Sequence, residues 1–142
     1  MLRVKHLLAA KGKEIWTVEA EDPVLEAIQL LANKHIGALP VMRNGTLVGI
    51  VSERDYARKI ILLGRSSAET PVWEIMSAPV TTVSPEDTVH YCMELVTEQR
   101  VRHLPVVDQG RLVAIVSIGD LVKAVIEEQQ ETIEQLQRFI AS

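Results

Sequence analysis

Residues 39–55 read LPVMRNGTLVGIVSERD, and residues 104–120 read LPVVDQGRLVAIVSIGD. In each stretch two apolar runs flank a polar dipeptide, Asn44-Gly45 or Gln109-Gly110, and the stretch ends on the pattern Ser-x-x-Asp. Asn-Gly between apolar runs is a strong signal for a β-hairpin, because a type I′ turn needs positive φ at both central residues. The chain is therefore predicted to contain one β-hairpin in two copies, each followed by a helix.

The repeat extends beyond the hairpins. Residues 15–60 align without a gap on residues 80–125, with 16 identical residues in 46 positions. Each copy reads as a short strand (15–18 or 80–83), a helix that opens at Asp22-Pro23 or Ser84-Pro85, the hairpin, and a second helix. This order predicts an α+β fold of two tandem βαββα units, with an additional helix before the first unit.

The domain boundaries follow from the repeat. We expect a first repeat over 1–64, a connector over 65–71, a second repeat over 72–129 and a helical extension over 130–142. A copy of ~60 residues is marginal for a hydrophobic core of its own. The two copies are therefore expected to pack together as one domain that covers residues 1–142.

The last helix is predicted to run past the end of its counterpart in the first copy, which stops near Gly64. Its apolar residues continue at helical spacing through Ile133, Leu136 and Ile140. Such an apolar stripe must be buried against another element, and the sequence leaves two alternatives open. The cover is either the chain's own N-terminal helix, near residues 2–8, or a second subunit.

Composition limits the classes of function. The formal charge of −4 argues against nucleic-acid binding as the main role. Cys92 is the only cysteine, and it aligns with Ala27 on an apolar helix face, which predicts a buried and inert thiol. The histidines show no metal-site spacing. No stretch approaches the ~20 apolar residues of a membrane span, and the N-terminus lacks a secretory apolar run, so we expect a cytoplasmic protein.

The repeated Ser-x-x-Asp pattern has two interpretations that do not exclude each other. Ser52 with Asp55, and Ser117 with Asp120, resemble a capping box that satisfies free backbone N–H groups at a helix start. A helix start also offers N–H donors and a positive dipole end to a phosphate. A carboxylate there can accept hydrogen bonds from a ribose diol.

Together these motifs resemble the CBS domain, and the resemblance is to the small stand-alone bacterial proteins that carry a pair of CBS repeats. It covers all of the chain up to about Gln129. The resemblance implies that the repeats pack about a pseudo-twofold axis and leave two clefts. In that family the clefts bind adenosine-containing ligands such as AMP, ADP, ATP, NAD or S-adenosylmethionine. Two CBS pairs commonly associate there, which implies a homodimer.

The resemblance also assigns roles to residues. Asp55 and Asp120 would hold ribose hydroxyls, and Ser52 and Ser117 would lie near ribose or phosphate. Thr17 and Thr82 would meet the adenine edge. The remaining candidates line the clefts or neutralise a phosphate, and they differ between the copies: Gly37, Ala38, Arg54 and Arg58 in the first, Arg102 and His103 in the second. Lys59 is expected to be a surface charge.

The leading functional hypothesis is a regulatory sensor that binds an adenine nucleotide, with AMP as first choice and ATP, ADP or NAD as alternatives, and signals to a regulated protein in trans. The alternative is a ligand-free interaction module that dimerises through its helices. An enzyme is not expected, because the sequence contains no Walker A motif, nucleophile elbow or dinucleotide-binding glycine fingerprint. No catalytic cofactor, metal, membrane or nucleic-acid partner is expected.

Overall fold

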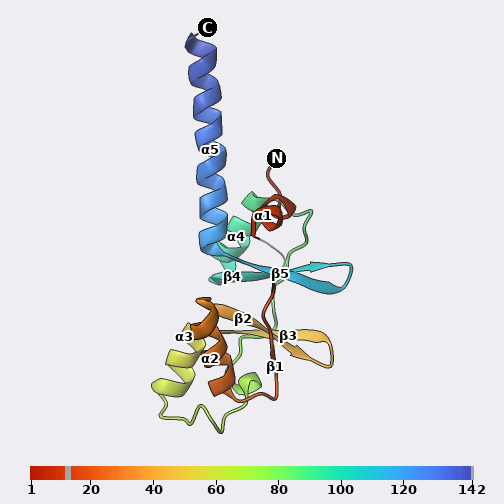
Figure 1. Cartoon of the computed structure of the whole chain (residues 1–142), viewed down its shortest axis with the longest axis vertical. Coiled ribbons are helices and arrows are strands. Elements are labelled where there is room, and N and C mark those ends of the chain that lie inside the picture. The colour runs from red at the N-terminus through yellow and green to blue at the C-terminus, as the bar shows by residue number, and fades with distance from the viewer. Residues whose placement is uncertain (12–13, 142) are drawn as a thin grey trace. The chain divides into compact units, whose positions relative to one another are not determined.

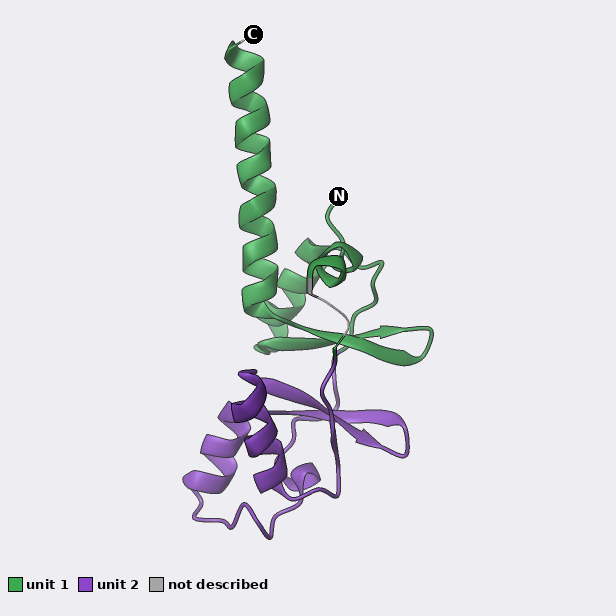
Figure 2. Ribbon diagram, viewed as in Figure 1, with its two compact units in different colours: residues 1–14, 82–142 green, residues 15–81 purple. Residues whose placement is uncertain are grey.

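The structure is a computed structural model that describes residues 1–11 and 14–141. The chain divides into two compact units, which Figure 2 shows in two colours. Unit 1 combines Met1–Glu14 with Thr82–Ser142, and unit 2 is Ile15–Thr81. The N-terminal segment therefore packs with the second repeat, and the segment that leads into the second repeat packs with the first. The compact units and the sequence repeats differ by this exchange of lead-in segments.

Unit 2 follows the predicted order of elements. Strand β1 (Val18–Glu19) pairs in parallel with β2 (Ala38–Arg43), which pairs antiparallel with β3 (Thr46–Ser52). Helix α2 (Val24–Lys34) lies between β1 and β2 in sequence (Figure 1). The second helix begins as α3 (Glu53–Tyr56) and continues as the π-helical segment η1 (Ala57–Ile61). A 3-10 turn, η2 (Val72–Glu74), follows the connector.

Unit 1 contains α1 (Val4–Lys11), α4 (Val89–Gln99), the hairpin of β4 (His103–Asp108) and β5 (Arg111–Ser117), and α5 (Ile118–Ala141). Both predicted hairpins are confirmed. The central residues of each turn have positive φ: 52° and 76° at Asn44 and Gly45, and 51° and 78° at Gln109 and Gly110. These values are those that a type I′ turn requires.

Two predictions for the start of the second repeat are wrong. The expected strand over 80–83 is reduced to a single parallel bridge between Val83 and Val106. Helix α4 does not open at Ser84-Pro85, because the carboxylate of Asp87 accepts a hydrogen bond from the Ser84 N–H (2.8 Å) and holds this stretch as a turn. The helix begins five residues after Ser84 at Val89, where the Thr88 hydroxyl caps the N–H of Tyr91 (3.1 Å).

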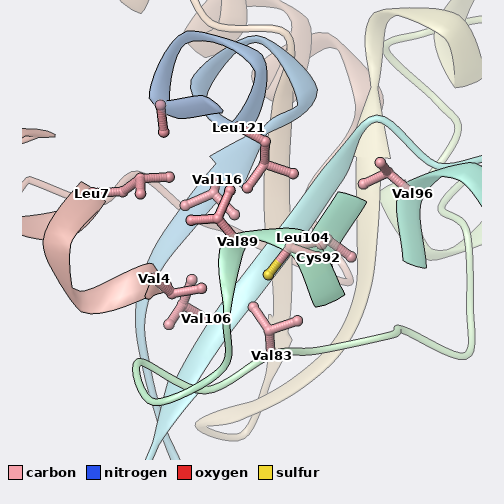
Figure 3. Close-up of a cluster of buried hydrophobic side chains, with 11 residues drawn as sticks. Val4, Leu7, Val83, Val89, Cys92, Val96, Leu104, Val106, Val116 and Leu121 are labelled. Carbon is pink, nitrogen blue, oxygen red and sulfur yellow. The ribbon is translucent and has the colours of Figure 1, made fainter. Parts of the chain in front are cut away.

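Each unit has its own apolar core, built mainly from Val, Leu, Ile and Ala. Figure 3 shows the core of unit 1, in which Val4 and Leu7 of α1 lie among side chains from α4, the hairpin and α5. Cys92 is fully buried in this core, and its burial raises the pKa of the thiol to about 11. The prediction of a buried thiol is confirmed, and the neutral thiol is a poor nucleophile at physiological pH.

The predicted long C-terminal helix is confirmed as α5, whose 24 residues form a single helix. Its first turns belong to the core, where Leu121 and Ala124 are buried with Val4 and Leu7. Figure 1 shows the rest of α5 continuing past the other elements of unit 1. Within residues 1–11 and 14–141, no helix has the length and apolar character needed to cross a membrane.

Candidate functional site

The candidate residues gather at the open end of each hairpin. Ala38, the first residue of β2, is paired with Ser52, the last residue of β3, and His103 is paired with Ser117 in the same way. One further backbone hydrogen bond joins each hairpin to the helix that follows. The Glu53 N–H donates to the carbonyl of Gly37 (3.2 Å).

In the second copy the equivalent bond runs from the Ile118 N–H to the carbonyl of Arg102 (2.8 Å). The residues that precede Leu-Pro-Val are therefore fixed beside the helix start in both units. This geometry follows from the hairpin register, because both ends of the hairpin are set by the same ladder of hydrogen bonds.

Both Ser-x-x-Asp motifs form capping boxes. In unit 2 the Ser52 N–H donates to Asp55 Oδ2 (3.0 Å), and the Asp55 N–H donates to Ser52 Oγ (3.2 Å). In unit 1 the Ser117 N–H donates to Asp120 Oδ2 (2.8 Å), and the Asp120 N–H donates to Ser117 Oγ (3.1 Å). The capping interpretation is therefore confirmed in both copies, and any ligand contact comes in addition to it.

Asp55 has further partners inside unit 2. The hydroxyl of Ser77 donates to Asp55 Oδ1 (3.2 Å), and Lys59 Nζ lies 3.6 Å from the same oxygen. The Lys59 ammonium also donates to the carbonyl of Ile75 (2.9 Å). Reciprocal backbone hydrogen bonds with Ile50 hold Ser77 against β3. Asp55 is only 8% exposed, so its carboxylate is enclosed by groups of its own unit.

Asp120 has different surroundings in unit 1. Lys59 aligns with Ala124 at the repeat offset of 65, and Ser77 corresponds to Ala9 when the lead-in segments are aligned through Val72 and Val4. At these two aligned positions the first copy carries a lysine and a serine, and the second copy carries alanines. Asp120 is half-buried there and lines a cavity of about 490 Å³ between α1 and α5.

The cavity beside Asp120 has an apolar floor and an acidic rim. Its floor includes Leu2, Leu7 and Ala124, and its rim includes glutamates of α5. Three glutamates, at positions 127, 128 and 131, give this rim a negative potential that disfavours a phosphate. Lys123 also lines the cavity and offsets part of this negative charge.

The remaining candidates lie around these two helix starts. Arg54 and Arg58 are exposed on α3 and η1, one helical turn apart. Arg102 is exposed just before β4, and His103 is half-buried as its first residue. The first hairpin therefore has two arginines in the helix that follows it, whereas the second has its basic pair at the start of β4.

Thr17 and Thr82 are both exposed. Each precedes a valine that pairs in parallel with the first strand of its hairpin: Val18 with Val41, and Val83 with Val106. The two threonines thus occupy equivalent register positions, one beside each hairpin.

Two residues of the site were not predicted. Lys59 was expected at the surface, although its spacing of four from Asp55 on a helix is a recognisable ion-pair signal. Ser77 lies 22 residues from Asp55, and no local pattern connects them. Among the described residues, no group of three or more His, Cys, Asp or Glu side chains could hold a metal ion.

Comparison with known proteins agrees with the fold. Residues 9–62 and 72–127 each match the family model of the CBS domain. The structure of a protein with CBS domains from Burkholderia ambifaria MC40-6 is 52% identical, with a TM-score of 0.85 over 89% of this chain and 96% of that one. The CBS domain pair of protein MJ0100, solved in complex with 5′-methylthioadenosine and S-adenosyl-L-methionine, is 25% identical, with a TM-score of 0.79 over 90% of this chain and 98% of that one.

A curated relative extends beyond this chain. CBS domain-containing protein CBSX3, mitochondrial, from Arabidopsis thaliana is 40% identical over 137 residues, which cover 93% of this chain. The match covers 66% of the plant protein, so this chain spans just under two thirds of that relative's length. From the two matched repeats and these similarities, the chain belongs to the CBS-domain family and carries two CBS repeats in tandem.

Proposed function

We propose that this protein is a regulatory module that binds an adenosine-containing ligand at its Ser-x-x-Asp helix starts and transmits the bound state to a regulated protein in trans. AMP is the first choice of ligand, and ADP, ATP and NAD are the alternatives. The observation that carries the proposal is the recurrence, in both units, of a capped helix start fixed beside a variable pair of residues at the open end of a hairpin.

The chemistry of these positions suits a nucleoside. A carboxylate at a helix start can accept two hydrogen bonds from a ribose diol, each worth ~1.5–3 kcal/mol because the acceptor is charged. Asp120 is the better candidate for this role, since it lines a cavity, whereas Asp55 is enclosed by Ser77 and Lys59. The ligands of the MJ0100 pair, 5′-methylthioadenosine and S-adenosyl-L-methionine, also contain adenosine.

The phosphate position follows from charge. The acidic rim of the cavity repels a phosphate, so the phosphate of a nucleotide bound at Asp120 would lie toward Arg102, whose carbonyl is bonded to the start of α5. Arg54 and Arg58 are the corresponding candidates at the other helix start. A ligand without phosphate would instead tolerate the glutamates. A preference for a phosphorylated ligand would therefore indicate the side toward Arg102, and a preference for a ligand without phosphate would indicate the side of the acidic cavity.

A thermal-shift panel tests the proposal. Wild-type protein is heated with AMP, ADP, ATP, NAD, adenosine or S-adenosylmethionine. A ligand at 100 times its Kd stabilises the folded state by ~2.7 kcal/mol. The variant Asp120→Ala should lose this response, and Arg102→Ala should lose it for AMP but retain it for adenosine.

The matched controls are Asp108→Ala and Arg111→Ala. Both residues are exposed, and they pair with each other at the closed end of the same hairpin, away from Ser117. These controls should respond as wild type does. The proposal is refuted if no adenosine ligand moves the wild-type midpoint, or if the controls lose the response together with Asp120→Ala.

The second candidate, an interaction module that needs no ligand, is favoured by one observation. The distal part of α5 exposes large apolar side chains, including Ile133, Leu136 and Ile140. A protein that responded to no ligand in the panel but associated through α5 would fit this candidate.

A further inference from the structure

The exposed apolar residues of α5 follow a heptad repeat. Ile126, Ile133 and Ile140 are spaced by seven residues, and so are Val122, Gln129 and Leu136. The two series alternate at spacings of four and three, which is the a/d pattern of a coiled coil with isoleucine at each of these three a positions. The pattern spans 19 residues of one uninterrupted helix, or ~27 Å at 1.5 Å per residue.

The chain's own elements do not cover this stripe. The exposed fractions are 60%, 47% and 81% for Ile126, Ile133 and Ile140, and 56% for Leu136. The α5 residues that face α1 across the cavity, such as Ala124 and Glu131, lie on the other side of the helix, roughly 180° from the stripe at 3.6 residues per turn. The N-terminal helix therefore covers the inner face of α5 and leaves the stripe exposed.

The charges of α5 argue for a second copy as the partner. The four glutamates at 127, 128, 131 and 134 occupy b, c and f positions, which point away from the seam of a coiled coil. The e and g positions from 125 to 139 are uncharged, so two identical helices meet without repulsion at their flanks. The acidic face of α5 opposite the stripe disfavours an anionic membrane surface, because interfacial helices of that kind are rich in Lys and Arg.

We propose that residues 122–140 of α5 form a parallel two-stranded coiled coil with the same residues of a second copy of this chain. This inference is independent of ligand binding. Isoleucine at the a positions, with leucine at the d position 136, favours two strands. Gln129 favours the parallel orientation, because a parallel register places its amide opposite the same amide of the partner. An antiparallel register places it opposite an apolar side chain and leaves it without a partner.

The apolar area of the stripe determines the expected affinity of the dimer. A fully exposed Val, Leu or Ile side chain has roughly 100 Å² of apolar surface. The exposed fractions of the five apolar a and d residues therefore correspond to an apolar area on the order of 300 Å² per chain that a partner could bury. A standard stable interface buries about 800 Å² per partner. The coiled coil is therefore expected to dissociate on dilution unless another surface of the two chains also associates.

Disulfide crosslinking tests the register. Gln129→Cys and Leu136→Cys are made separately in the full chain, with Gln135→Cys, at a c position away from the stripe, as the matched control. Native Cys92 does not interfere, because its thiol is buried and has a raised pKa. Under mild oxidation both d-position variants should form crosslinked dimers, and Gln135→Cys should not. An antiparallel pair can bring at most one of the two positions against itself.

A charge in the seam tests the energetics. Ile133→Asp should raise the dimer Kd, measured by analytical ultracentrifugation, by about a hundredfold, because it buries two carboxylates. Gln135→Asp adds the same charge outside the seam and should leave the Kd within about threefold. Both sites are exposed in the single chain, so neither variant should lower the unfolding midpoint at concentrations where the wild type is monomeric.

Four results would overturn the inference: crosslinking of Gln135→Cys at the rate of Leu136→Cys, crosslinking at only one d position, a trimeric mass, or a dimer whose Kd is unchanged by Ile133→Asp. Binding of the wild type to phosphatidylserine vesicles that Ile133→Asp abolishes would also overturn it, by assigning the stripe to a membrane.

Discussion

The substitution Asp55→Ala tests whether the enclosed carboxylate of unit 2 is mainly structural. Its removal deletes the acceptor in the capping box with Ser52, which costs about 1 kcal/mol. It also leaves the Ser52 N–H and the Ser77 hydroxyl without this acceptor at a site that is 8% exposed. A buried group left unsatisfied costs about 1–3 kcal/mol. The expected loss in the free energy of unfolding is therefore about 2–4 kcal/mol.

Lys59 adds little to this total. Its side chain is 41% exposed, and its ammonium keeps a hydrogen bond to the carbonyl of Ile75 when the carboxylate is removed. Ion pairs at this exposure contribute about 0–1 kcal/mol. The loss on Asp55→Ala is thus expected to come from the cap and from Ser77 rather than from the ion pair, and Lys59→Met should cost less than about 1 kcal/mol.

Urea unfolding followed by circular dichroism measures the effect, with Glu53→Ala as the matched control. Glu53 is exposed in the same first turn of α3 and should cost no more than about 1 kcal/mol through the helix dipole. Asp55→Asn should fall between wild type and Asp55→Ala. If Asp55→Ala costs no more than Glu53→Ala, the internal partners of the carboxylate contribute nothing, and Asp55 is then available to a ligand.

Three other substitutions test the fold. Gly45→Ala should destabilise by about 1–2 kcal/mol, because φ is +76° in open space and only the left-handed backbone penalises the new Cβ. Gly119→Ala should be neutral or stabilise by up to about 1 kcal/mol, since its Cβ would lie 3.5 Å from Ser117 Oγ inside a helix; chemical denaturation measures both. Burial raises the pKa of the Cys92 thiol from its ordinary value of 9.0 to about 11 in the folded state, so the stability that the neutral thiol contributes is fully present below pH 9 and is lost as pH rises to 11. Wild type should therefore lose about 2–3 kcal/mol relative to Cys92→Ala across that range, and a constant difference between the two would contradict the assignment.

Local signals account for what the sequence predicted correctly. The hairpins follow from Asn44-Gly45 and Gln109-Gly110, and the helix starts follow from Ser52 and Ser117. In each case the partners lie within a few residues of one another, so the pattern contains the whole interaction. The local roles of these motifs, in forming turns and capping helices, could therefore be predicted without any tertiary information.

The errors arise where distant or competing groups decide the local structure. Helix α4 starts late because Asp87 bonds back to Ser84, a side-chain interaction that competes with the helical backbone. The role of Ser77 could not be predicted, because it depends on the pairing of Ser77 with Ile50, and that pairing joins segments that are distant in sequence. The ribose, adenine and phosphate roles assigned to the candidate residues stay predictions.

The exchange of lead-in segments explains why two similar motifs present different sites. Within the aligned repeat Asp55 and Asp120 are equivalent, and a comparison of the repeats alone gives both the same role. The segment that packs against each motif comes from outside the aligned repeat, however. Unit 2 receives Ser77 from the segment that precedes the second repeat, whereas unit 1 receives α1 with Ala9 at the corresponding position.

Two of the changes of residue type between the copies lie at these aligned positions, Ser77 against Ala9 and Lys59 against Ala124. Ser77 and Lys59 surround the Asp55 carboxylate from within the fold, whereas Ala124 lines the cavity together with Asp120. If these residues cause the difference, Ala124→Lys should place an ammonium at the cavity beside Asp120 and abolish the ligand response. Because Ala124 is buried in the core of unit 1, circular dichroism must first show that this variant is folded. An unchanged ligand response in Ala124→Lys would show that the ligand does not use the cavity side of Asp120.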